Sequence, residues 1–464
     1  MLENNFTKRC DQVSIAGFCM LIFFLPISIA LIEWSFGFIF LSFLIKRAYV
    51  FNQEIKKYKV FNKNISLGEK IILFLESFKP VPNTVNKSIG FYILIAFVSV
   101  LISCNPAQSL KAFFCKLLED CYFFFIFIEV INSLPRLRII LCVFSVSILV
   151  VTLNGLVQFF HGTDLIHGFG WGDGRIVSCF KHSNDYGAYL VIVIMMLLGI
   201  LMTHCFVSKE DRQSWKIYLL EILTLLLLIL SLTNLGLTFS RGAWVGFGGA
   251  MLFFAFWRPK FLWLNIFIIG AFFIFFQPLM ILSRNVNFNS DFTYNVQGKN
   301  LSDKEHAKSK NFQEWFHRIL EERFSNFSGM GRIYYWQEAM HVIKHRPIFG
   351  NGLNTYALLA PKYKIYGGIY PHNCYLQMAA EVGIVGLLAF GWIIWSIFQS
   401  VRRFIRQSQD KFLSSLALGV LSGFFGFLVH SAFDTQFYSV QLSSFMWLIM
   451  GMLAALPKIG TTLK

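Results

Sequence analysis

Charged residues are scarce in this sequence: Asp, Glu, Lys and Arg make up 14% of its 464 residues. Roughly a quarter of an ordinary soluble protein is charged, so the scarcity argues against a soluble fold. The nine cysteines include no Cys-x-x-Cys pair, and several lie inside apolar runs. This pattern indicates neither a zinc site nor a disulfide framework, and we expect no metal and no cofactor.

What the sequence has instead is apolar residues, 56% of the chain. They form runs of about twenty residues, the length that a helix needs to cross a bilayer. We therefore predict an all-α polytopic membrane protein with about 12 transmembrane helices and one long, partly helical periplasmic loop between spans 9 and 10. The predicted spans lie near residues 13–31, 34–45, 89–104, 112–130, 139–160, 186–206, 217–238, 242–257, 261–282, 374–398, 412–430 and 438–456.

The formal net charge of +16 is explained by topology rather than by nucleic-acid binding, because the basic residues fill every second linker. The positive-inside rule places those linkers and both termini in the cytoplasm. The domains predicted are transmembrane helices 1–9 in residues 1–282, the periplasmic loop in 283–373, and helices 10–12 in 374–464. We expect ordered helices within the loop, a flexible part at 285–311, and an interfacial helix on the cytoplasmic side at 65–78.

Polar groups suited to chemistry fall in the segments that this topology turns outward. They are Arg175 before span six, Arg241 in the turn between spans seven and eight, Arg332 in the long loop, and His372 with Asn373 at the start of span ten. An arginine presents a planar fork of donors that matches phosphate oxygens. A histidine near neutral pH can accept a proton from a hydroxyl. Together these residues favour glycosyl transfer from a polyprenyl diphosphate.

Each of these residues also has a structural interpretation. An arginine at the end of a span often binds lipid phosphate, and His372 could be an interfacial histidine. Gly383 and Gly386 are interpreted as small residues that allow close helix packing. Glu381, buried in span ten, is expected to pair with an arginine or to line the cavity, and we predict that Glu381 and Asn373 both bind substrate. Asp434, at the outer end of span eleven, is a further candidate.

The ordered set of motifs resembles the O-antigen ligase and O-antigen polymerase superfamily of bacterial envelope enzymes. The family pattern is a His-Asn pair, nine residues and Gly-x-x-Gly, which here is His372-Asn373 followed by Gly383-Ile-Val-Gly386. The segments that begin at Phe180, Phe239, Gly331 and His345 resemble the other family motifs, although residue 183 is serine where proline is usual. The resemblance covers roughly residues 170–400.

The resemblance implies a metal-independent, inverting glycosyltransferase in the bacterial inner membrane, with its active site facing the periplasm. It implies that Arg175, Arg241 and Arg332 bind the diphosphate of an undecaprenyl-diphosphate-linked glycan, and that His372 is catalytic or orients the donor. The acceptor remains open: lipid A-core for a ligase, a glycan repeat unit for a polymerase, or a protein hydroxyl. A solute transporter is a further alternative, but transporters place ionisable groups near the bilayer midplane, whereas most of these residues lie at span ends.

Overall fold

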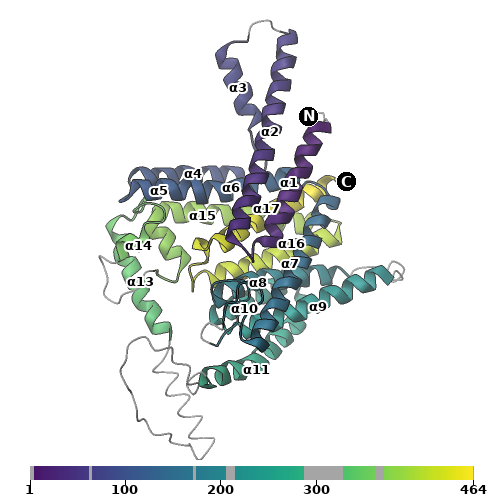
Figure 1. The fold of residues 1–464 in the computed structure, drawn as a ribbon, viewed down its shortest axis with the longest axis vertical. Coiled ribbons are helices and arrows are strands. Elements are labelled where there is room, and N and C mark those ends of the chain that lie inside the picture. Colours follow the sequence, from purple (N-terminus) through teal and green to yellow (C-terminus); the bar gives the residue numbers. More distant parts are fainter. Residues whose placement is uncertain are drawn as a thin grey trace, which may run out of the picture.

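The computed structural model describes residues 5–61, 65–170, 174–204, 215–286, 328–360 and 370–462. The described residues are almost entirely helical, as predicted (Figure 1). The helices are α1 (Asn5–Phe24), α2 (Ile29–Phe61), α3 (Leu67–Ser77), α4 (Asn86–Leu101), α5 (Pro106–Ala112), the π-helix η1 (Phe113–Leu118), α6 (Glu119–Val130), α7 (Leu134–His161), α8 (Ser183–His204), α9 (Trp215–Leu237), α10 (Arg241–Trp257), η3 (Pro259–Phe261), α11 (Leu262–Val286), α13 (Ser328–His345), α14 (Tyr356–Leu359), α15 (Cys374–Gln407), α16 (Lys411–His430), η5 (Gln436–Tyr438) and α17 (Val440–Thr462).

Seven of the described helices are long and apolar enough to cross a membrane. A helix covers most of each of the predicted ranges, but the figure of twelve spans stays a prediction. The second predicted span, near 34–45, is only part of the 33-residue α2. The helix expected in the long loop is present as α13, whereas the predicted helix around 315–324 and the flexible part at 285–311 lie outside the described residues.

The helix expected near residues 65–78 is α3, which begins with a capping box between Ser66 and Glu69. It packs beside the far end of α2, where the rings of Phe51 and Phe74 lie 5.6 Å apart. Figure 1 shows α2 and α3 projecting together beyond the other helices, on the side where both chain ends lie. Several apolar side chains of α3, including Leu67, are exposed in this hairpin.

The centre of the protein is α16, which packs against α8 on one side and α10 on the other. Glycines allow the close approach: a Cβ on Gly199 of α8 would lie 2.6 Å from the Ser415 carbonyl oxygen, and one on Gly246 of α10 would lie 2.6 Å from that of Gly426. Small residues at such contacts let membrane helices gain van der Waals contact along their backbones. This packing fixes the amino ends of α8 and α10 beside the carboxyl end of α16.

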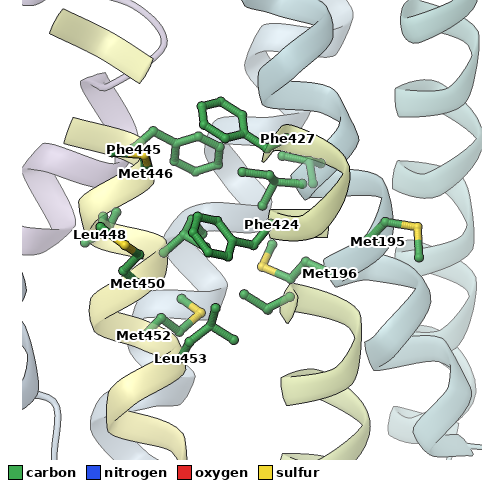
Figure 2. Packing of buried hydrophobic residues seen from close by; sticks show 14 of the residues in the cluster. Met195, Met196, Phe424, Phe427, Phe445, Met446, Leu448, Met450, Met452 and Leu453 are labelled. Atoms are coloured by element: carbon green, nitrogen blue, oxygen red, sulfur yellow. The ribbon is translucent and has the colours of Figure 1, made fainter. Parts of the chain in front are cut away.

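Phenylalanine and methionine side chains complete the core beside these contacts. Figure 2 shows Met196 of α8, Phe424 of α16, and Phe445 and Met450 of α17 filling the space between the three helices. Methionine is flexible enough to fill irregular gaps, which suits helices that cross at unequal distances.

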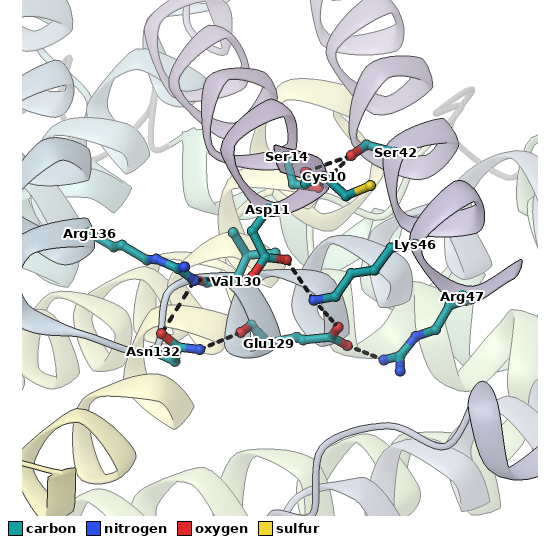
Figure 3. A network of polar contacts seen from close by, with 10 residues as sticks. All are labelled: Cys10, Asp11, Ser14, Ser42, Lys46, Arg47, Glu129, Val130, Asn132 and Arg136. Carbon is teal, nitrogen blue, oxygen red and sulfur yellow. Dashed lines mark hydrogen bonds and ion pairs between the residues drawn. The ribbon is translucent and has the colours of Figure 1, made fainter. Parts of the chain in front are cut away.

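A buried network of ion pairs links α1, α2, α6 and α7 to one another (Figure 3). Lys46 of α2 lies 2.6 Å from Asp11 of α1 and 2.8 Å from Glu129 of α6, and Arg47 also contacts Glu129. Arg136 of α7 donates to the Val130 carbonyl oxygen at 2.7 Å and lies 3.4 Å from Asp11. These pairs tie α1, α2, α6 and α7 together at the end that the charge pattern predicts to be cytoplasmic.

Candidate functional site

The candidate site is built around the start of α15. Asn373 is the N-cap of this helix, and its side-chain oxygen accepts hydrogen bonds from the backbone N–H of Tyr375 at 3.0 Å and of Leu376 at 3.1 Å. Asparagine is a favoured N-cap because it satisfies donors that the first helical turn leaves unpaired. His372 precedes this cap with φ of +48°, in the left-handed region. Such conformations in residues other than glycine cluster at functional sites.

Asp434, in the segment after α16, holds the His372 ring. Its Oδ1 lies 3.2 Å from His372 Nδ1 and accepts the Thr435 backbone N–H at 2.8 Å. The His372 side chain is 44% exposed, so its ring is accessible, whereas that of Asp434 is only 11% exposed. Burial opposes ionisation of Asp434, but hydrogen bonding to His372, the nearby His430 and the Thr435 N–H together lower its pKa to about 2.

This geometry selects one tautomer of His372. An ionised carboxylate only accepts hydrogen bonds, so the Nδ1 that faces Asp434 must carry a proton. The neutral ring then has its lone pair on Nε2, which is the nitrogen able to take a proton from a hydroxyl. A base held by a buried carboxylate in this way is the arrangement that enzymes use to orient a catalytic imidazole.

A chain of hydrogen bonds joins this pair to the turn that carries Arg241. Asn184, in the first turn of α8, donates from Nδ2 to Asp434 Oδ2 and accepts the Ser240 hydroxyl at 2.8 Å. Ser240 is the N-cap of α10 and accepts the Ala243 N–H at 3.3 Å. The residue before it, Phe239, also has a left-handed φ of +46°. Asp434 is therefore connected through Asn184 to the backbone that positions Arg241.

His430, the last residue of α16, contacts the same turn, at the residue that follows Arg241. A Cβ on Gly242 would lie 2.6 Å from His430 Cδ2, so the backbone after Arg241 rests against this buried ring. Arg241 itself is the first residue of α10, and it is exposed. Only glycine allows this contact, because any side chain at position 242 would displace the imidazole.

The other two predicted arginines approach the same group. Arg332 of α13 is close enough to His430 to interact with it electrostatically. One turn further along α13, the ring of Tyr335 lies 5.7 Å from the ring of His372. Arg175 donates from Nη1 to the Ser183 hydroxyl at 3.3 Å, directly beside Asn184. The segments that carry Arg175, Arg241, Arg332 and His372 therefore meet around Asp434.

The helix ends at the site add positive potential. The amino ends of three long helices, α8, α10 and α15, lie together here, because Asp434 contacts both His372 and Asn184, and Asn184 contacts Ser240. The first turn of a helix leaves backbone N–H groups unpaired and carries about half a positive charge. Helix starts and arginines in one place make a site that favours an anion with several oxygens, such as a phosphate.

Glu381 does not join this group. Its carboxylate accepts the backbone N–H of Asn354 at 2.8 Å and of Tyr356 at 3.3 Å, and the Gln377 amide at 3.2 Å. No ion pair with an arginine is present among the described residues. Glu381 was expected to pair with an arginine or to line a cavity, and it lines a cavity. The lining of that cavity includes none of the three predicted arginines. Asn373, predicted to bind substrate, has its side-chain oxygen occupied in capping α15.

The interpretation of Gly383 and Gly386 as a pair that packs helix on helix was wrong for Gly383. Gly383 has φ of +78° and interrupts α15, so that Ile384 N–H donates to the Pro347 carbonyl oxygen at 2.8 Å. A Cβ at position 383 would lie 2.1 Å from the Ile348 carbonyl oxygen. The close partner is thus a loop. Gly386 faces Ile95 of α4, which agrees with the predicted helix contact.

The side chains that connect the site were not predicted as site residues. Asn184 and Ser240 lie in the motifs that begin at Phe180 and Phe239, and His430 is the last residue of α16. A Ser or Asn directly before an apolar run is an N-cap signal, and this signal could have identified Ser240. Within the described ranges, no three His, Cys, Asp or Glu side chains gather as metal ligands would.

These observations define a multi-pass membrane protein with a polar site, which includes arginines, at the ends of its helices. A family model described as O-antigen ligase matches residues 226–391, and the predicted resemblance to the O-antigen ligase and polymerase superfamily is confirmed for this part of the chain. The family implies a membrane glycosyltransferase or ligase. Arg241, Arg332 and His372 lie within the matched residues, whereas Arg175 and Asp434 lie outside them. No curated protein matches the chain.

Proposed function

We propose that this protein transfers a glycan from undecaprenyl diphosphate to an acceptor hydroxyl at the periplasmic face of the bacterial inner membrane. The observation that carries the proposal is the accessible imidazole of His372, held by Asp434 where three helix amino ends meet. Arg241 and Arg332 supply fixed positive charge from two of the segments that meet around Asp434. This combination suits a reaction in which a diphosphate leaves and a hydroxyl loses a proton.

In the proposed reaction, the acceptor oxygen attacks C1 of the donor sugar from the face opposite the diphosphate. The bond between C1 and the diphosphate oxygen breaks, its electron pair leaves with the diphosphate, and the anomeric configuration inverts. Nε2 of His372 takes the proton of the acceptor hydroxyl, and Asp434 stabilises the resulting imidazolium. Arg241, Arg332, Arg175 and the helix amino ends stabilise the charge that develops on the leaving diphosphate.

The proposal is tested with purified protein, a lipid-linked glycan and an acceptor glycolipid, and the joined product is followed by gel mobility. His372→Ala and Arg241→Ala should each abolish transfer while the protein remains inserted and abundant. Arg241→Lys should also be impaired, because an ammonium cannot form the two parallel contacts of a guanidinium. The exposed Arg138, at the far end of the bundle, provides the matched control Arg138→Lys. Retained transfer in both alanine variants would reject the assignment.

A polymerase that joins repeat units shares this donor chemistry and is the second candidate. The description of the matching family favours the ligase. The two differ when the protein receives a lipid-linked repeat unit alone: a polymerase lengthens the chain, and a ligase does nothing without its own acceptor. A peptide acceptor in the same assay would test transfer to protein hydroxyls.

A further inference from the structure

A cavity with several polar residues in its lining lies beside the candidate site. Its volume is about 570 Å³, which is in the usual range for a small-molecule pocket. Its lining is mixed: carboxylates, lysines, hydroxyls and aromatic rings come from α2, α4, α6, α15, α17 and the η1 and η5 turns. The polar side chains in its lining include those of Glu33, Tyr92, Lys116, Glu119, Asp120 and Tyr438.

An irregular helix shapes one wall of this cavity. The continuous run from α5 to α6 contains the π-helix η1, which ends at Leu118, directly before Glu119 and Asp120. A π-helix widens the helical turn, and such insertions occur frequently at functional sites. Here the widened turn directs Lys116, Glu119 and Asp120 toward the same space.

The two acidic side chains differ in their partners. Asp120 accepts hydrogen bonds from the hydroxyls of Ser443 and Ser444 of α17, the latter at 3.0 Å. Glu119 is only 9% exposed, and within the described part of the chain no hydrogen bond reaches its carboxylate, whose charged neighbours are Glu33 and Asp120. The carboxyl group of Glu119 faces the cavity, where a ligand can hydrogen-bond to it without breaking a bond within the protein.

Tyr92 of α4 presents a second unused group. Its side chain is 5% exposed and lines the cavity, and no hydrogen bond to its hydroxyl is present among the described residues. The rings of Phe390, Phe437 and Trp447 supply apolar walls nearby. The Glu119 carboxyl group and the Tyr92 hydroxyl can form hydrogen bonds with a ligand that lies between the aromatic rings. This arrangement matches a sugar ring, which has hydroxyls at its edge and C–H groups on its faces.

The same chemistry excludes other ligands. A diphosphate inside this cavity would face Glu119 and Asp120, and repulsion would oppose its binding. An acyl chain would leave the Glu119 carboxylate and the Tyr92 hydroxyl unsatisfied. The lysines, Lys111 and Lys116, are exposed at the rim, where they can meet an anionic substituent of a glycan without entering the interior.

The cavity is joined to the candidate site by a short stretch of chain. Asp434 holds His372, and Phe437, Tyr438 and Ser439, which follow it within five residues, line the cavity. Met378 also lines it, only four residues into α15, or about 6 Å along the helix axis. A glycan seated here could extend its terminal hydroxyl toward His372.

We infer that this cavity binds a sugar unit of the acceptor glycan while the lipid-linked diphosphate occupies the arginine site. The inference rests on the proposed function and adds the place and chemistry of the second substrate. Glu119 and Tyr92 bind the hydroxyls of the sugar, the aromatic rings contact its faces, and Lys116 lies over the rim.

Binding without turnover tests this inference separately from the reaction. The purified protein in detergent is titrated calorimetrically with two probes: a deacylated acceptor oligosaccharide, taken both from lipid A-core and from the repeat unit, and farnesyl diphosphate. Glu119→Gln and Tyr92→Phe should each weaken oligosaccharide binding about tenfold and leave farnesyl diphosphate binding unchanged. Arg241→Ala should show the reverse pattern. Tyr122→Phe, on α6 but outside the cavity lining, is the matched control.

The outcomes separate the two claims. Absence of oligosaccharide binding to the unsubstituted protein, or equal binding by the two cavity variants and the control, overturns the inference even if glycan transfer is active. Loss of farnesyl diphosphate binding in the cavity variants also overturns it, because the cavity would then belong to the donor. The expected binding pattern in a protein that transfers no glycan would support the cavity and reject the proposed function. Both substitutions preserve side-chain shape, and a single symmetric elution peak confirms that each variant is folded.

Discussion

Replacing Asp434 by asparagine is the most informative single change at the site. The shape of the side chain is preserved, but Asp434 now accepts from His372 and Thr435 on one oxygen and from Asn184 on the other. An amide has one oxygen and one NH₂ group, so either His372 or Asn184 would meet a donor where it needs an acceptor. Hydrogen bonds to a charged group contribute roughly 1.5–3 kcal/mol each.

The lowered pKa of Asp434 gives an independent measure of how much its contacts stabilise the folded protein. Lowering it from 3.8 to about 2 corresponds to about 2.4 kcal/mol of stabilisation of the ionised form in the folded protein. Because the folded pKa lies below the unfolded one, this stabilisation is complete above about pH 4 and is lost as the pH falls toward 2. Asp434→Asn should therefore lower unfolding free energy by about 2 kcal/mol at neutral pH and remove this acid-dependent part.

The effect on transfer should exceed the effect on folding. Without the carboxylate, His372 loses both its orientation and the charge that stabilises its protonated form, and general-base catalysis contributes roughly 10²–10⁴-fold. We expect glycan transfer by Asp434→Asn to fall at least 10²-fold at neutral pH, with donor binding retained. The assay is the initial rate of product formation with purified protein, beside a thermal unfolding curve. Transfer at the unsubstituted rate would refute the role given to this pair.

Three further pairs of substitutions test contacts beside the site and at the opposite end of the helices. Gly383→Ala places a Cβ 2.1 Å from the Ile348 carbonyl oxygen at a left-handed φ and should cost roughly 1–3 kcal/mol, measured by thermal unfolding, whereas Gly386→Ala should cost less because it meets only side chains. Asn373→Ala should cost about 1 kcal/mol through loss of the cap of α15, and Asn373→Asp, which keeps an acceptor oxygen, should recover most of it. Glu129→Gln removes the carboxylate partner of the buried Arg47 and one of the two carboxylate partners of Lys46, and should cost about 3 kcal/mol, while Glu54→Gln, in an exposed pair, should cost at most about 1 kcal/mol. Equal melting temperatures within any of these pairs would contradict the corresponding contact.

The helices were predictable because apolar runs of fixed length have one stable form in a bilayer. The same reasoning placed Arg241 and His372 at helix starts, where the structure has them. It could not foresee that Asn184 of α8 links Ser240 to Asp434, because that link depends on how α8, α10 and α16 pack. Periodicity describes each helix separately, whereas the crossing of three helices depends on glycines such as Gly199 and Gly246.

Gly383 was interpreted wrongly because its spacing matches that of a packing residue, and hydropathy does not reveal a positive φ within an apolar run. For Glu381, the prediction that it binds substrate stays a prediction. The structure adds a role that the sequence did not indicate, because the Glu381 carboxylate accepts the backbone N–H groups of Asn354 and Tyr356 in the loop before α15.

The proposed function requires that the site around His372 and Asp434 cleaves the bond between a glycan and a polyprenyl diphosphate. The release of undecaprenyl diphosphate from a lipid-linked glycan tests this cleavage, when it is quantified together with the joined product in the presence of acceptor. We expect one equivalent of undecaprenyl diphosphate for each glycan joined by the unsubstituted protein, and none with His372→Ala. Equal release by both proteins would refute a role of His372 in the cleavage.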